Sequence, residues 1–167
     1  MFRLLFAQTL FSCLFIGNVM ANPIGNLQKV GSAKLEMYFF DIYYSELYSA
    51  NGKYQPGQYP LALQIRYLRD IEAIDLIEKT AEEWQKLGFS RDKTAPWLVQ
   101  LDTLWPDIKK HDVLTLVVNN GGSSEFYFND KSIGKVEDTE FGAHFLDIWL
   151  DENASYPKLR KKLIGEK

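Results

Sequence analysis

The spacing of apolar residues changes period along the chain and divides it into predicted strands and helices. From Ala33 the chain is rich in aromatic and β-branched residues, which predicts a strand long enough to bend or break near Asp41. Turn signals follow, and residues 60–69 form a second predicted strand. In residues 72–87 apolar side chains recur every three or four positions, which predicts an amphipathic helix that stops at Gly88.

The second half of the chain continues in runs of helices and strands. A second helix is predicted over residues 96–104, ending before Pro106. Alternating patterns separated by turn residues then predict an antiparallel meander of three strands, at residues 113–118, 124–128 and 132–136. A further helix is expected over residues 139–149, and a short one from Tyr156-Pro157. Such runs favour an α+β fold, with helices covering one face of a mainly antiparallel sheet.

The first predicted strand is apolar on both faces. Side chains alternate along a strand, so one face would carry Leu35, Met37, Phe39, Asp41 and Tyr43, and the other Glu36, Tyr38, Phe40, Ile42 and Tyr44. Because buried rings are chiefly packing, we expect Phe39, Phe40 and Ile42 to belong to the core. The tyrosines differ, since a buried hydroxyl needs a partner or water.

Length, composition and the first residues indicate how many domains the protein has and where it is located. The 167 residues, 46% of them hydrophobic, suit one globular domain. Residues 1–21 resemble a secretory signal, with Arg3 before an apolar run and a small-residue cleavage site ending at Ala21. We therefore expect one domain over residues 22–167 in a periplasmic or secreted protein. The apolar run is shorter than a bilayer requires, so no transmembrane segment is expected in the mature chain.

Charge and ligand-forming residues exclude several classes of function. Loss of the signal removes one base and no acid, so the formal net charge changes from −3 to −4. The basic cluster at residues 158–162 is more typical of a helix face than of a polyanion site, so we expect no nucleic-acid partner. The only cysteine is Cys13, and the chain has two histidines, so neither a metal site nor another cofactor is expected.

Several short segments, in their order and spacing, resemble the bacterial chalcone isomerase-like proteins over nearly the whole mature chain. These segments are the glycine turn at residues 31–35, RYLRDI at 66–71, WQKLG at 84–88, FYFND at 126–130 and FGAHFLDIWL at 141–150. The resemblance implies an open-faced β-sandwich, in which a large antiparallel sheet is covered by helices. It also implies that a cleft between sheet and helices takes the ligand.

The resemblance also locates the positions that carry chemistry in the plant enzymes. Their arginine after the glycine turn is similar in position to Lys34, and their strand threonine to Tyr43. Their tyrosine and asparagine on the next helical segment correspond to Glu72 and Lys79. None of the four is retained, so no catalytic residue is assigned. An isomerase or lyase with Lys34 as oxyanion stabiliser remains an alternative, because a cation near a developing oxyanion suffices for such chemistry.

Other members of the superfamily are non-catalytic fatty-acid binders, in which a basic residue and strand hydroxyls hold a carboxylate. This resemblance predicts binding of a small amphipathic molecule such as a fatty acid. The ligand-binding candidates are Lys34, Tyr43, Arg66, Tyr38 and Arg69. The two arginines could instead form structural ion pairs with Asp41, Asp70 or Glu36. A third alternative is an envelope interaction protein whose cleft is closed by its own side chains.

Overall fold

The computed structural model describes residues 22–166, so the expected signal segment lies outside the described residues. Six strands form one sheet in the order β1-β2-β3-β4-β5-β6, and each neighbouring pair is antiparallel. The strands are β1 (Gln28–Met37), β2 (Phe40–Ser49), β3 (Leu61–Tyr67), β4 (Val113–Val118), β5 (Ser124–Phe128) and β6 (Lys131–Val136). The predicted meander over β4, β5 and β6 is confirmed.

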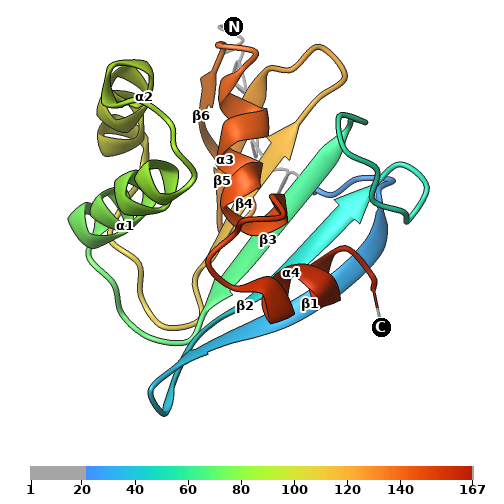
Figure 1. The fold of residues 1–167 in the computed structure, drawn as a ribbon, viewed down its shortest axis with the longest axis horizontal. Helices are drawn as coiled ribbons and strands as arrows, with labels where there is room; N and C mark the ends of the chain where they lie inside the picture. Colours follow the sequence, from blue (N-terminus) through green and yellow to red (C-terminus); the bar gives the residue numbers. More distant parts are fainter. Residues whose placement is uncertain (1–21, 167) are drawn as a thin grey trace, which may run out of the picture.

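Within residues 22–166, four helices cover this sheet: α1 (Ala73–Lys86), α2 (Arg91–Leu104), α3 (Phe141–Leu150) and α4 (Pro157–Leu163). Figure 1 shows α3 and α4 lying across the sheet, with α1 and α2 beside α3. The predicted α+β fold, an antiparallel sheet covered by helices, is therefore confirmed. No helix of residues 22–166 is both long and apolar enough to cross a membrane.

Helix α2 begins at Arg91, five residues before the predicted start. The prediction placed Pro96 in the first turn, where a missing N–H costs nothing. In the structure Pro96 lies inside the helix. Pro96 is exposed to solvent. The backbone carbonyl that loses its hydrogen bond to an N–H at position 96 can therefore bond to water.

The break expected near Asp41 is present, but it lies at Tyr38 and Phe39 and divides the segment into two antiparallel strands, β1 and β2. The chain reverses at Tyr38 and Phe39, where both residues have positive φ, of 55° and 153°. No glycine or asparagine marks this turn, so the sequence carries no ordinary turn signal there. At the tip, Phe39 is fully exposed and Phe40 is 63% exposed, so their predicted place in the core is wrong. Ile42 is partly buried and packs against the core, as expected.

The hairpin register decides which side chains face the helices. Leu35 pairs with Tyr43, which pairs with Tyr67, and all three are buried beneath the helices. The neighbouring row is formed by Lys34, Tyr44 and Arg66, and it points to the opposite face because side chains alternate along each strand.

Two close approaches fix the helices to the inner face. A Cβ added to Gly142 on α3 would lie 2.6 Å from Ser124 Oγ and 2.8 Å from the Val118 methyl groups. A Cβ added to Gly31 on β1 would lie 2.6 Å from the Leu163 carbonyl oxygen of α4. Glycine at these positions therefore allows backbone and side chains to approach closely. Aromatic rings from α1, α2, α3 and β5, including Trp84, Trp97 and Phe126, fill the rest of this interior.

Candidate functional site

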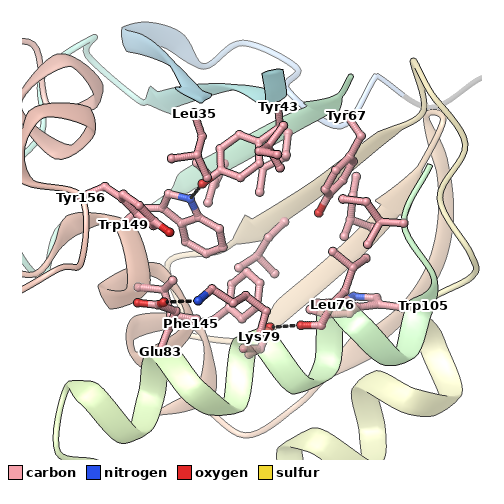
Figure 2. Close-up of a pocket in the computed structure, with 18 of the residues that line it drawn as sticks. Leu35, Tyr43, Tyr67, Leu76, Lys79, Glu83, Trp105, Phe145, Trp149 and Tyr156 are labelled. Atoms are coloured by element: carbon pink, nitrogen blue, oxygen red, sulfur yellow. Dashed lines mark hydrogen bonds and ion pairs between the residues drawn. The ribbon is translucent and has the colours of Figure 1, made fainter. Parts of the chain in front are cut away.

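A cavity of about 280 Å³ lies between the inner face of the sheet and the helices α1 and α3. Its floor is formed by strand residues that include Leu35, Leu63 and Leu116. Its other walls carry Leu76 of α1 and Phe145 of α3 (Figure 2). Most of the lining is apolar, so the cavity favours an apolar molecule. The cleft implied by the resemblance is thus present and is not filled by the protein's own side chains.

Tyr43 is the one predicted site residue that lines this cavity. It is buried on β2, and its hydroxyl oxygen accepts a hydrogen bond of 2.8 Å from the indole N–H of Trp149 on α3. Burial raises the pKa of Tyr43, although the N–H of Trp149 acts in the opposite direction. The phenol is therefore neutral at physiological pH, and its own O–H remains available as a donor.

Lys34 and Arg66 lie on the opposite face of the sheet, which corrects their predicted place beside Tyr43. The Lys34 ammonium pairs with Glu36 and, at 2.9 Å, with Asp41. The hydrogen bond from Lys34 holds the pKa of Asp41 below its usual value. Arg66 donates to the His111 carbonyl oxygen at 3.4 Å. Lys34 is therefore not placed to act as the electrophile that the isomerase alternative requires.

Tyr38 and Arg69 also lie outside the cavity. Tyr38 is 87% exposed at the hairpin tip, and the Arg69 guanidinium lies 5.7 Å from the centre of the Phe40 ring. The acids expected to pair with the arginines have other partners. Asp41 pairs with Lys34, and Asp70 pairs with Lys109 at 3.2 Å. In the described part of the chain, neither Arg66 nor Arg69 has a carboxylate within ion-pair distance.

A charged cluster on α1, which the sequence did not indicate as a site, forms one end of the cavity. Glu83 lines the cavity with only 5% of its side chain exposed. Its carboxylate pairs with Lys79 at 3.0 Å and Lys86 at 2.9 Å, and accepts a hydrogen bond from Ser155. Burial alone would raise the pKa of Glu83, but the hydrogen bonds from Ser155, Lys86 and Lys79 prevail and lower it.

Of the two helix positions that the resemblance singled out, only Lys79 reaches the cavity, and Glu72 does not line it. The spacing of Lys79, Glu83 and Lys86 is that of surface ion pairs on a helix, and it gives no sign that Glu83 is buried. Ser155 lies 72 residues away in sequence. The signal that could have found this cluster is an acid next to Trp84, the most buried residue of the helix.

Two uncharged donors lie at the other side of the cavity. Tyr67 is buried, and burial alone raises the pKa of its phenol. No hydrogen bond joins its hydroxyl to another residue within 22–166. The indole N–H of Trp105 is enclosed and also has no acceptor among these residues. Figure 2 shows Tyr67 and Trp105 on the side away from Glu83, Trp149 and Tyr156.

The lining of the cavity suits the binding of a largely apolar molecule. In the described part of the chain, no group of three or more His, Cys, Asp or Glu side chains is placed to hold a metal ion. The cavity combines apolar walls, neutral phenol and indole donors, and one internally paired charge cluster. It can therefore hold an apolar molecule and orient its few polar atoms.

Comparisons with known proteins agree with this geometry. A family model described as chalcone isomerase-like matches residues 25–165. A protein of Haemophilus influenzae described as uncharacterized is 28% identical over 146 residues, covering 87% of this chain and 72% of that protein. The crystal structure of an Arabidopsis thaliana fatty-acid binding protein is similar in fold, with a TM-score of 0.65 and 12% identity. That similarity covers 84% of this chain and 88% of the plant protein.

Proposed function

Because the chain belongs to the chalcone isomerase-like family, we propose that it is a non-catalytic binding protein for a small, largely apolar ligand such as a fatty acid. The cavity between the sheet and helices α1 and α3 is the proposed binding site. The observation that carries the proposal is this cavity of about 280 Å³ with its predominantly apolar lining. Its volume is close to the lower end of the roughly 300–1,000 Å³ usual for ligand pockets.

The energetics of the lining support a bound ligand. Apolar walls that face an unfilled space lose the dispersion contacts that a close-packed interior would supply. A ligand with an alkyl chain restores those contacts and gains about 0.8 kcal/mol for each methylene group that it buries. A chain of about ten methylene groups therefore contributes about 8 kcal/mol, before the cost of immobilising the ligand is subtracted.

Tyr43 is the residue that we assign to orienting the ligand. Trp149 donates to the Tyr43 oxygen, so the phenol is held in one position with its proton free for a ligand oxygen. Of the residues predicted from the sequence, Lys34 and Arg66 have no place in this site. Among the described residues that line the cavity, the one cation is Lys79, and it is already paired with Glu82 and Glu83.

Cavity-filling tests the proposal directly. Leu76→Trp adds bulk to the cavity wall, and Val99→Trp places the same side chain at an exposed position on α2. The wild-type protein and the Val99→Trp control should bind a fluorescent fatty acid equally. Leu76→Trp should bind it at least about tenfold more weakly, since the indole occupies the ligand's space.

Native mass spectrometry of protein purified from its own compartment gives a second measurement. We expect a retained molecule of lipid mass in the wild type and a reduced amount in Leu76→Trp. Equal binding by both tryptophan variants, or no retained molecule together with no fluorescent fatty-acid binding, would refute the proposal.

The proposed compartment rests on the sequence. Residues 1–21 have the charged start, apolar run and small-residue cleavage site of a secretory signal, so we propose export with cleavage after Ala21. Amino-terminal sequencing of the protein from fractionated cells should give Asn22 as the first residue, in the periplasmic or secreted fraction. An intact amino terminus at Met1 would contradict export by this route.

A further inference from the structure

The side of the cavity lined by Tyr67 and Trp105, here called the Tyr67 end, differs chemically from the side lined by Glu83. Tyr67 lies on β3 directly opposite Tyr43, with the two ring centres 6.1 Å apart. In Figure 2 the Tyr67 hydroxyl points into the cavity, whereas the Tyr43 hydroxyl points toward Trp149. The two phenols therefore serve different parts of the same space.

Both donors at the Tyr67 end lack a partner within residues 22–166. The Tyr67 hydroxyl forms no hydrogen bond there, and the Trp105 indole nitrogen is enclosed without an acceptor. Most buried polar groups in proteins are hydrogen-bonded, and a buried donor without a partner carries a desolvation penalty. The Tyr67 hydroxyl faces the cavity, so it is the donor that an acceptor atom of a ligand would satisfy.

No charge balances a carboxylate at this end. Among the described residues, the charged groups that line the cavity are Lys79 and Glu83, and both belong to the cluster on the other side. Lys79 is held there at 3.0 Å from Glu83 and 3.1 Å from Glu82. Burying an ionised group without a partner is far more costly than burying a neutral acceptor.

Building on the proposed binding function, we infer that the Tyr67 end receives an uncharged oxygen acceptor of the ligand, such as an ester or aldehyde carbonyl. Tyr67 donates its O–H to that oxygen. The cavity then prefers a neutral alkyl ester or aldehyde to the carboxylate with the same alkyl chain. The alkyl chain extends from this end over the apolar floor, which includes Leu63 and Leu116.

The test compares methyl decanoate, decanal and decanoate at a mildly alkaline pH at which the acid is ionised. Displacement of a neutral fluorescent probe measures affinity for the wild type, for Tyr67→Phe, and for the control Tyr127→Phe on the outer face of β5. We expect the ester and the aldehyde to bind at least about tenfold more tightly than the carboxylate. We expect Tyr67→Phe to lose about tenfold for the ester and Tyr127→Phe to match the wild type.

Indole N–H resonances give an independent readout. Trp105 lines the cavity beside Tyr67, whereas Trp84 and Trp97 do not line it. Addition of methyl decanoate should therefore move the Trp105 indole signal, identified by its loss in Trp105→Phe, further than those of Trp84 and Trp97.

The outcomes separate the two proposals. If none of the three molecules binds the wild type, the binding function fails and this inference fails with it. If they bind, but the carboxylate binds best, or Tyr67→Phe binds the ester as tightly as the wild type, or the Trp105 signal stays in place, only the inference about the Tyr67 end is overturned.

Discussion

Replacing Glu83 with glutamine tests whether the charged cluster on α1 stabilises the fold. The change keeps the shape of a 95%-buried side chain and removes its charge. Each ion pair, to Lys79 and to Lys86, joins Glu83 to a lysine that is about half exposed, so each is worth only about 0.5 kcal/mol. Weakening the charge-assisted hydrogen bond from Ser155 costs about 1 kcal/mol more.

The expected total for Glu83→Gln is a loss of about 2 kcal/mol in the free energy of unfolding at neutral pH. For a chain of this size, that loss corresponds to a fall of about 6 °C in Tm. Glu82→Gln is the matched control, because Glu82 is the adjacent acid, is 59% exposed and, among residues 22–166, pairs with Lys79 alone. It should lose less than about 0.5 kcal/mol. Urea unfolding followed by tryptophan fluorescence measures both variants.

The pH dependence of stability gives a second test of the contribution of Glu83. The folded-state pKa of Glu83 is lowered, so its contribution to stability is present above the unfolded value, which is about 4.3, and is lost as pH falls through the folded value. The difference between wild type and Glu83→Gln should therefore shrink in acid. A deficit no larger than that of Glu82→Gln, or one that is the same at acidic and neutral pH, would refute the assigned role.

Three further changes test other parts of the structure. Tyr38→Asn combined with Phe39→Gly should raise the free energy of unfolding by about 1 kcal/mol, because both side chains are exposed and both residues have positive φ. Urea unfolding measures this change. A lower free energy of unfolding would mean that the two rings pack against the protein in solution. Gly142→Ala should lower Tm by several degrees, since about 1–3 kcal/mol of overpacking exceeds the gain in helix propensity; an unchanged Tm would contradict the close approach of α3. Lys34→Met should leave fatty-acid affinity within about twofold of wild type, because the Lys34 side chain lies on the face of the sheet opposite the cavity. A larger loss of affinity would show that Lys34 takes part in ligand binding.

Local patterns in the sequence determined most of the secondary structure. The three- and four-residue spacing of apolar side chains predicted α1 almost to its bounds, and alternating residues between turn signals predicted β4, β5 and β6. These features depend on interactions between near neighbours in sequence, so the chain itself carries the information. Order and spacing of short segments also led to the correct family and fold.

The faces of the first hairpin could not be derived in the same way. Both faces of the segment from Leu35 to Tyr44 are rich in apolar residues, so hydrophobicity does not show which one meets the helices. Tyr38 and Phe39 adopt backbone angles that asparagine and glycine favour. The residue types therefore did not indicate the position of the tight turn. Alternation along the chain separates Lys34 from Tyr43, and only the packing of the helices decided that the Tyr43 face lines the cavity.

The sequence by itself therefore determined the α+β fold, the antiparallel meander and the amphipathic helix. Only the tertiary structure decided the polar surroundings of that cavity: Glu83 meets Ser155 across 72 residues, and Tyr67 and Trp105 lack acceptors within residues 22–166. The physical reason is that burial of a polar group depends on elements distant in sequence that pack around it.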